Sequence, residues 1–356
     1  MLICYVSDMS IPSKAANTIQ VMNMCEALAK CGNRVVLFVS KKREPDEAIF
    51  DYYGVEPVFG IEELGCEGFK KSYVCAVKAA LRAAGNNECL VYGRFLKGCF
   101  ACLAVGKRVV LELHQPPEST RSVADFLLWR LGRCHLEAVI TASYSLKRYL
   151  VARGVAEGRL FALTNASKPF FGGGASRGEV VVGYAGTVSS RKGSGVLGEL
   201  ALFLKRGFRG VVLRVLGRVM EGVPAESAGF VPYGRVKGEL STFDVALLPM
   251  RGTYRGRLEG EEVFFGVPLK LLDYMSVGLP VVASSNPLVE EVLDGKRGVL
   301  VEQSDLEAWK EALLCLCFSP AARRRLSIRV RDSFDRYTWS ARAQGVLGVL
   351  KGLGNG

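Results

Sequence analysis

Two segments in the second half of the chain combine cations, glycines and predicted helix starts. The first, VVGYAGTVSSRKG at 181–193, is typical of a strand, a glycine-rich loop and two adjacent cations, Arg191 and Lys192, before a helix. Glycine lets a backbone approach a phosphate closely, and cations can neutralise the charge that grows on a leaving diphosphate. Residue types alone favour a plainer interpretation, a solvated pair of cations at a helix start.

The second segment, PLKLLDYMSVGLPVVA at 268–283, predicts a helix followed by a buried strand. Pro268 suits the first turn of the helix, and Gly278 suits the position just past its end. Lys270 and Asp273 lie three residues apart near the helix start, where free N–H groups and the helix dipole favour an anion such as a diphosphate. An acidic side chain one turn further could hold a ribose diol. A surface helix with one Lys and one Asp is the alternative.

Polar residues in the first half of the chain also follow predicted strands. His114, one of only two histidines, ends the strand predicted over 108–113, where it could contact a substrate or be a satisfied structural side chain. Ser13, Lys14 and Asn17 join the first strand to the first helix, a suitable place for an acceptor or phosphate contact. Capping of the helix would explain Asn17 equally well.

The elements that position these residues alternate between strands and helices. In the first half we predict strands at 2–7, 34–40, 89–92, 108–113 and 138–141, with a helix at 18–30. In the second half we predict strands at 180–185, 211–216, 245–248 and 281–283, helices at 196–205 and 268–277, and a final helix at 334–350. This order indicates an α/β fold with two open parallel sheets, each covered by helices.

The length of 356 residues suits two domains, and the Pro- and Gly-containing stretch 165–178 is the best linker candidate. We expect an N-terminal Rossmann-like domain over 1–165, a C-terminal one over 166–333, and a C-terminal helix over 334–356 that crosses back to the first domain. Such folds bind ligands at the carboxyl ends of their strands. Two facing domains would place the site in the cleft between them.

Composition narrows the possible partners and location. The formal net charge of +12 favours anions such as nucleotide diphosphates or anionic lipid headgroups, while no motif typical of nucleic-acid binding is present. No apolar run is long enough to span a bilayer, and the N-terminus does not resemble a signal peptide, so we expect a cytoplasmic location. The positive net charge is compatible with peripheral docking on the inner membrane face. Eleven cysteines then indicate reduced, mostly buried thiols; the C-x-x-C of Cys99 and Cys102 suits a helix face in the core.

The 268–283 segment resembles the donor-binding motif P-x-K-x-x-E-Y-M-A-x-G-x-P-V-V of family 4 of the retaining, sugar-nucleotide-dependent glycosyltransferases. Asp273 stands where the family usually has Glu. Many members carry a second acidic residue eight positions earlier, where this chain has Phe265. The chain is therefore similar to the subgroup whose motif begins with Pro-x-Lys, and this resemblance implies a GT-B fold, two Rossmann-like domains facing across a cleft.

Other segments resemble family elements in the same order along the chain. The 186–193 loop is similar to the family element G-x-x-x-x-x-K-G, and residues 112–114 are similar to E-x-H, whose His contacts the donor sugar. Residues 10–22 resemble the loop that lies over the donor phosphates and near the acceptor. Residues 230–234 resemble the segment that lines the base pocket. The resemblance gives catalytic roles to His114, Arg191 and Lys192. It implies donor contacts for Gly186, Thr187, Val231, Tyr233, Pro268, Leu269, Lys270 and Asp273, and acceptor or phosphate contacts for Ser13, Lys14 and Asn17.

The resemblance implies a retaining glycosyltransferase that moves a sugar from a nucleotide-diphosphate donor to a glycan or lipid-linked acceptor. The leaving diphosphate itself helps to take the acceptor proton, so no cofactor and no protein nucleophile are expected. No D-x-D sequence is present, and we therefore expect no metal. A GT-B-fold sugar-nucleotide epimerase remains an alternative, with Glu112 as its clearest acid–base candidate but one that we interpret as structural. A non-catalytic nucleotide-sugar-binding partner is the other alternative, suggested by Phe265 and Asp273.

A dehydrogenase is disfavoured. The G-x-G-x-x-G sequence at 193–198 does not follow its strand directly, and no acidic residue ends the next strand at 216–218.

Overall fold

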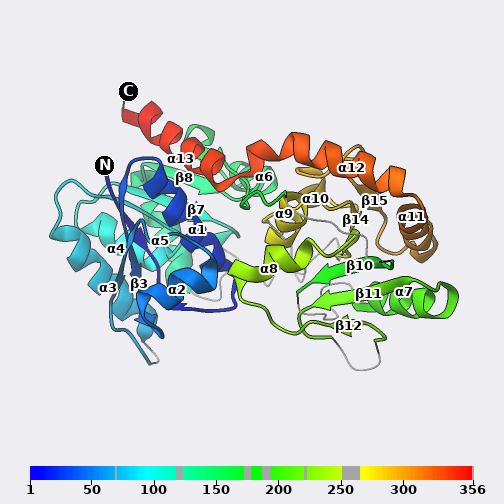
Figure 1. Cartoon of the computed structure of the whole chain (residues 1–356). Coiled ribbons are helices and arrows are strands. Elements are labelled where there is room, and N and C mark those ends of the chain that lie inside the picture. Colours follow the sequence, from blue (N-terminus) through cyan, green and yellow to red (C-terminus); the bar gives the residue numbers. More distant parts are fainter. Residues whose placement is uncertain are drawn as a thin grey trace. The chain divides into compact units, whose positions relative to one another are not determined.

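The computed structural model describes residues 1–68, 70–117, 123–171, 178–186, 194–219, 223–250 and 265–354. The chain forms two compact units, which Figure 1 shows coloured along the sequence. The first comprises Met1–Asn165 and the chain from Trp339 onward, and the second comprises the described residues between Ala166 and Thr338. No helix in these described ranges combines the length and apolar composition needed to cross a membrane.

The first unit is built on a seven-stranded parallel sheet in the order β5-β3-β1-β6-β7-β8-β9. Its strands are β1 (Leu2–Val6), β3 (Arg34–Val39), β5 (Gly60–Glu63), β6 (Leu90–Gly93), β7 (Val109–Leu113), β8 (Ala138–Thr141) and β9 (Leu160–Ala162), and a separate pair is formed by β2 (Ser10–Ile11) and β4 (Lys41–Lys42). Its helices are α1 (Ala16–Lys30), α2 (Asp46–Tyr53), α3 (Lys71–Ala84), α4 (Leu96–Ala104), α5 (Val123–Gly132), α6 (Tyr144–Ala152) and α13 (Trp339–Gly354), with 3-10 helices η2 (Arg133–His135) and η3 (Glu157–Arg159).

The order of the strands places the helices on two faces of this sheet. The chain steps from β1 to β3 to β5 in one direction and from β6 to β9 in the other, and right-handed crossovers then put α1 and α2 on one face and α3 to α6 on the opposite face. The α13 helix packs on α1, while α3 packs on α4 and α4 on α5. Strands covered on both faces are mostly apolar; every residue of Val109–Leu113 is buried, and Glu112 is the one charged residue of this strand.

The second unit contains a six-stranded parallel sheet in the order β12-β11-β10-β13-β14-β15. Its strands are β10 (Val180–Ala185), β11 (Val211–Leu216), β12 (Glu226–Ser227), β13 (Val245–Leu248), β14 (Val281–Ser284) and β15 (Val299–Val301). Its helices are α7 (Ser194–Gly207), α8 (Tyr233–Leu240), α9 (Leu269–Ser276), α10 (Pro287–Glu290), α11 (Leu306–Phe318) and α12 (Pro320–Ser333), followed by the 3-10 helix η5 (Phe334–Tyr337). One apolar core lies between the sheet and α7 with α11, and another between the sheet and α9.

Three details of the structure bear on the sequence predictions. Gly278 adopts a positive φ of 74° just after α9, which confirms its predicted role past the helix end. The predicted linker does not begin as a free segment, because Ser167 is fully buried in the second unit and its N–H donates to Tyr337 O at 2.9 Å. The last α-helix begins at Trp339 and not at residue 334, because residues 334–337 form η5.

The predicted core position of the C-x-x-C pair is confirmed. Cys99 and Cys102 are fully buried on α4, and burial raises the pKa of the Cys102 thiol to about 12.

Candidate functional site

In the second unit, the carboxyl ends of β10 and β11 meet at two glycines. The Gly186 N–H donates to Leu216 O at 2.8 Å. Gly186 has a φ of 122° and Gly217 a φ of 142°, and a Cβ on Gly217 would lie only 2.6 Å from Gly186 O. A side chain is therefore excluded sterically at Gly217, and the chain presents bare backbone at the strand ends.

Lys270 reaches this pair of glycines from the first turn of α9. A Cβ on Gly186 would lie 3.0 Å from Lys270 Nζ, so the ammonium group directly adjoins the loop. Lys270 Nζ donates to Tyr184 OH at 2.9 Å and lies 4.1 Å from the centre of the Tyr184 ring. Burial raises the pKa of Tyr184 to about 12, so its phenol stays neutral and accepts from the ammonium group.

The helix that carries Lys270 is fixed to the end of β10. The Ala185 N–H donates to Tyr274 OH at 2.7 Å, and Tyr274 is fully buried. Pro268 precedes the first residue of α9, Leu269, and both are partly exposed. A helix start, a cation and two glycines thus adjoin one another, an arrangement that can bind an anion such as a phosphate. Sequence reasoning predicted Gly186 and Lys270 but missed Gly217, whose signal was a Gly directly after a buried strand.

Asp273 lies one turn further along α9 in a buried network. The residue is 5% exposed, and its Oδ1 accepts from Ser167 Oγ at 2.6 Å and from Tyr233 OH at 2.8 Å. Lys237 Nζ donates to Ser167 Oγ at 2.7 Å and also to the carbonyl of Lys168. Asp273 therefore ties the segment after Asn165 to α8 and α9, and its predicted contact with ribose stays a prediction.

Burial displaces the titration of both charged groups in this network. It raises the pKa of Asp273, against the opposing effects of Lys237, Ser167 and Tyr233. It lowers the pKa of Lys237 to about 8, although Asp273 favours the charged ammonium. It also raises the pKa of Tyr233 well above its ordinary value, so that Tyr233 donates to the carboxylate as a neutral phenol.

The remaining donor-contact candidates of this unit are distributed as follows. Val231 is partly buried against the core that contains α9, and Tyr233 opens α8. Thr187, Arg191 and Lys192 lie outside the described residues. The structure therefore brings Gly186 and Lys270 together and connects Tyr233 with Asp273.

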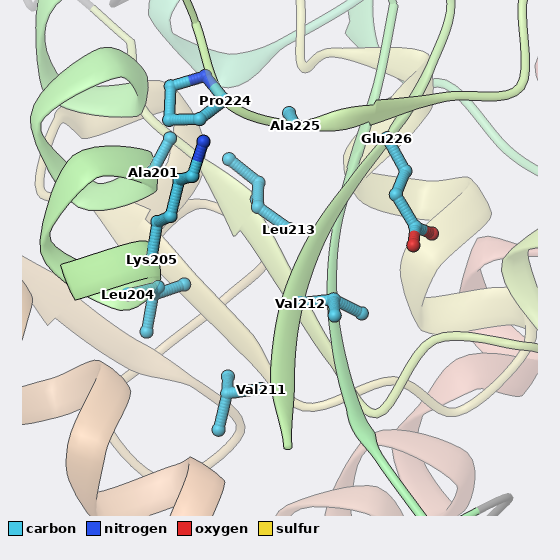
Figure 2. A pocket seen from close by; sticks show the side chains of 9 residues that line it. All are labelled: Ala201, Leu204, Lys205, Val211, Val212, Leu213, Pro224, Ala225 and Glu226. Carbon is cyan, nitrogen blue, oxygen red and sulfur yellow. The ribbon is translucent and has the colours of Figure 1, made fainter. Parts of the chain in front are cut away.

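A separate pocket of this unit is not part of the site formed by Gly186, Gly217 and Lys270, which we call the glycine site. It has a volume of about 340 Å³ and lies between α7, β11 and β12 (Figure 2). Val211, Val212 and Leu213, from the amino-terminal half of β11, line it, whereas Gly217 follows the carboxyl end of that strand. Apart from Lys205 and Glu226, the lining of the pocket is apolar, and Glu226 forms an ion pair with Arg214 at 2.9 Å. The pocket and Gly217 thus belong to opposite ends of β11.

In the first unit, Glu112 at the end of β7 is the centre of a buried polar network. Its Oε1 accepts from Gln20 Nε2 at 2.8 Å and from Arg342 Nη2 at 2.8 Å, and lies 2.5 Å from His114 Nε2. Tyr92 OH donates to Oε2. The residues come from α1, β6, β7 and α13, so one carboxylate joins four elements.

The charges in this network fix the protonation of both partners. Burial would raise the pKa of Glu112, but the guanidinium of Arg342 and the hydrogen bond from His114 hold it well below its ordinary range. Burial, aided by Arg94, lowers the pKa of His114 to about 4, although Glu112 opposes this shift. His114 is therefore neutral at pH 7, its Nε2–H donates to the Glu112 carboxylate, and its Nδ1 is left as an acceptor.

Arg342 is a member of this network that sequence reasoning missed. It is 4% exposed on a helix whose other buried residues are apolar, and its signal was an arginine on the apolar face of that helix. Arg94 Nη1 also joins the network by donating to Gln20 Oε1 at 2.9 Å.

The predicted loop after β1 lies at the same edge of the sheet as His114, because β1 and β7 are parallel. Ser13 Oγ accepts from the Ala15 N–H at 3.2 Å, and the Ser13 N–H donates to Tyr53 OH at 2.8 Å. Lys14 is exposed. The predicted cap at Asn17 is wrong: α1 begins at Ala16 with Ala15 as its N-cap, so Asn17 lies inside the first turn.

Comparison with known proteins addresses the stretch that contains the glycine site. Residues 179–318 match the family Glycosyl transferases group 1. WcaL of Salmonella typhimurium, a proposed glycosyltransferase of colanic acid biosynthesis, is 37% identical over 84 residues, which are 23% of this chain and 19% of WcaL. The amylovoran biosynthesis glycosyltransferase AmsK of Erwinia amylovora is 34% identical over 89 residues, 25% of this chain and 20% of AmsK. The chain thus matches about a fifth of the length of these curated relatives.

Solved structures resemble the chain over nearly its whole length. Sucrose-phosphate synthase from Thermosynechococcus elongatus superposes with a TM-score of 0.72 at 18% identity over 99% of each chain. HepE of Anabaena, in complex with UDP and glucose, gives a TM-score of 0.73 at 13% identity over 99% of this chain and 100% of HepE. At these identities the likeness establishes the fold: two Rossmann-like domains of the GT-B type, as the sequence predicted.

Proposed function

We propose that this chain is a retaining glycosyltransferase that transfers a sugar from a nucleotide-diphosphate donor to an acceptor hydroxyl. The observation that carries this proposal is the meeting of Gly186, Gly217 and Lys270 at the carboxyl ends of β10 and β11. This is where Rossmann-like sheets bind ligands, and the stretch that matches Glycosyl transferases group 1 contains all three residues. The bare backbone and the ammonium group suit the diphosphate of such a donor.

In the proposed reaction, the bond between the anomeric carbon and the diphosphate oxygen breaks. The acceptor oxygen bonds to the same face of that carbon, and the leaving diphosphate takes the acceptor proton. Lys270, with Arg191 and Lys192, stabilises the negative charge that develops on the leaving group. No protein nucleophile is required, and the absence of a D-x-D sequence supports a reaction without a metal.

His114 is the proposed contact to the donor sugar. As a neutral imidazole with Nε2–H given to Glu112, it offers Nδ1 as a hydrogen-bond acceptor to a sugar hydroxyl. Glu112 is held by Arg342, Gln20 and Tyr92 and is fully buried, so we assign it a positioning role. This assignment argues against the epimerase alternative, which would need Glu112 to exchange a proton with substrate.

The donor and acceptor classes are supported by relatives. HepE was solved with UDP-glucose, which supports a sugar bound through a nucleoside diphosphate. WcaL and AmsK are named for the biosynthesis of colanic acid and amylovoran, which supports a growing polysaccharide as acceptor. We propose that the chain acts in polysaccharide synthesis, with a glycan or lipid-linked acceptor.

The proposal can be tested by following both products of the reaction. The purified chain is incubated with nucleotide-sugar donors and candidate oligosaccharide or lipid-linked acceptors in the presence of EDTA, and released nucleoside diphosphate and the new glycosidic bond are followed by NMR. We expect a product with the anomeric configuration of the donor sugar. A product of opposite configuration would contradict the retaining mechanism. Formation of an epimerised nucleotide-sugar would show that the chain is an epimerase and not a transferase.

A further inference from the structure

Two helices of the first unit carry an outward-facing apolar surface. Eight of the 18 exposed large apolar side chains in the described ranges lie on α3 and α5: Tyr73, Val74, Val77 and Leu81, and Val123, Phe126, Leu127 and Leu131. On each helix three of them recur at intervals of four residues and form one stripe. Leu81 is 66% exposed and Leu131 is 75% exposed, so these side chains do not belong to the core.

The two stripes are joined through α4 into one surface, which we call the α3–α5 face. Lys97 of α4 lies 5.2 Å from the centre of the Tyr73 ring and forms an ion pair with Asp125 of α5 at 2.6 Å. The α4 helix is more buried than its neighbours, and an apolar groove of about 450 Å³ runs between α4 and α5. This groove is lined by Phe100, Leu103, Ala104, Leu128, Leu131, Gly132 and His135.

Cations are interspersed among the apolar side chains of this face. The α3 helix contains Lys71, Lys78 and Arg82 and no acidic residue, and Arg82 forms an ion pair with Glu62 of β5 at 2.5 Å. On α5 the one acidic residue is Asp125, which Lys97 neutralises. Arg130 is exposed on the same helix. The surface is therefore apolar and positively charged, on a chain whose formal net charge is +12.

We propose that the α3–α5 face docks on an anionic phospholipid bilayer. Exposed Leu, Val, Phe and Tyr side chains would enter the headgroup–acyl boundary while Lys and Arg stay with the phosphates, as in interfacial amphipathic helices. A second copy of the chain would bring like charges together, which disfavours a dimer through this face. A nucleic acid would leave the apolar stripes without partners.

The position of the α3–α5 face suggests how membrane docking would serve the reaction, an argument that rests on the proposed function. Helices that follow parallel strands begin at the carboxyl edge of the sheet, so the first turns of α3 and α5, with Tyr73 and Val123, lie at the same edge of the first sheet as His114. A bilayer seated on this face would present a lipid-linked acceptor next to that edge. We infer that the acceptor is carried on a membrane lipid.

Vesicle cosedimentation tests this surface directly. We compare phosphatidylcholine vesicles with phosphatidylcholine–phosphatidylglycerol vesicles, at low and high salt, using the whole chain, the double variant Leu127→Glu/Leu131→Glu and the double variant Val77→Glu/Leu81→Glu. A matched control, Phe318→Glu/Ile328→Glu, places two carboxylates at exposed apolar sites of the second unit. Circular dichroism and thermal melting establish that each variant is folded.

We expect salt-sensitive binding to the anionic vesicles, a loss of at least about tenfold in each α3 and α5 variant, and binding unchanged in the control. Absence of binding by the folded wild-type chain at low salt would overturn the proposal, as would an equal loss in the control. A concentration-dependent dimer that the α5 variant disrupts would assign the face to a second copy. In parallel, sugar transfer from the donor to a soluble acceptor is measured without vesicles. A variant that no longer binds vesicles but still transfers the sugar has lost docking alone, whereas absence of transfer by the wild-type chain would count against the proposed function.

Discussion

Arg342 and Glu112 form a buried ion pair at 2.8 Å although 230 positions separate them in the sequence. Their side chains are 2% and 0% exposed. The pair connects the last helix, α13, to the end of β7, where His114 lies two residues further on. This ion pair therefore connects the C-terminal helix to Glu112, the carboxylate that holds His114, our proposed contact to the donor sugar.

Arg342→Met should destabilise the first unit by about 3–5 kcal/mol, because it leaves the Glu112 carboxylate buried without its counter-ion. The free energy of unfolding from urea titration measures this loss. Lys351→Met, at an exposed position of the same helix, is the control and should change stability by less than about 0.5 kcal/mol. Similar losses in the two variants would show that Arg342 contributes only through packing of its aliphatic part.

Acid should weaken the first unit through His114. Its pKa is about 4 in the folded chain and about 6.5 when unfolded, so the unfolded chain binds more protons between these values. Stability is therefore expected to fall by roughly 1.4 kcal/mol per pH unit at most as pH decreases from 6.5 toward 4. Urea unfolding across this range tests it. His114→Asn should flatten the profile in this window; an unchanged slope would assign the pH dependence to other groups.

Gly217→Ala should specifically impair the glycine site. The new Cβ would lie 2.6 Å from Gly186 O in a backbone conformation that L-residues avoid, so we expect a cost of about 1–3 kcal/mol and weakened donor binding. Gly210→Ala is a suitable control because Gly210 also has a positive φ, of 79°, but a Cβ there meets no atom within 4 Å. Isothermal titration with the donor separates the two effects: equal donor affinity in both variants would remove Gly217 from the site.

Tyr184→Phe should lower stability by about 0.5–1.5 kcal/mol, because Lys270 loses a hydrogen-bond acceptor but keeps the ring beneath it. If the phenol positions the ammonium group, donor affinity should also fall by a few fold. Thermal melting and donor titration measure the two quantities. An unaltered donor affinity would mean that the ring alone places Lys270.

The sequence predicted much of the fold, because strands buried on both faces are mostly apolar and stand out as short apolar runs. The strands 180–185, 211–216 and 245–248 have the predicted bounds. Short edge strands such as β5 and β12 went unnoticed, since they are too polar and too short to give a periodic signal. The start of α1 was misplaced because Asn17 is a favoured cap residue, yet Ala15 occupies that position without a side-chain hydrogen bond.

The candidate site was only partly predictable, because its parts come from distant segments. Gly186 and Lys270 were found from local motifs, but their proximity depends on how α9 is fixed to β10 through Tyr274. The buried contacts of Asp273 with Ser167 and Tyr233 are long-range and leave no local pattern. The same holds for Arg342, whose partner Glu112 lies 230 positions earlier in the sequence.

The central claim is that the second unit binds a nucleotide-diphosphate sugar through Lys270. Binding of UDP-, GDP- and ADP-sugars, measured by isothermal titration with EDTA present, tests it most directly. Lys205→Ala, in the pocket at the opposite end of β11, serves as the matched control for Lys270→Ala. We predict binding of one nucleotide class, reduced at least about tenfold by Lys270→Ala and retained by Lys205→Ala. Binding that survives Lys270→Ala unchanged, or no binding of any nucleotide-sugar by the folded chain, would contradict the claim.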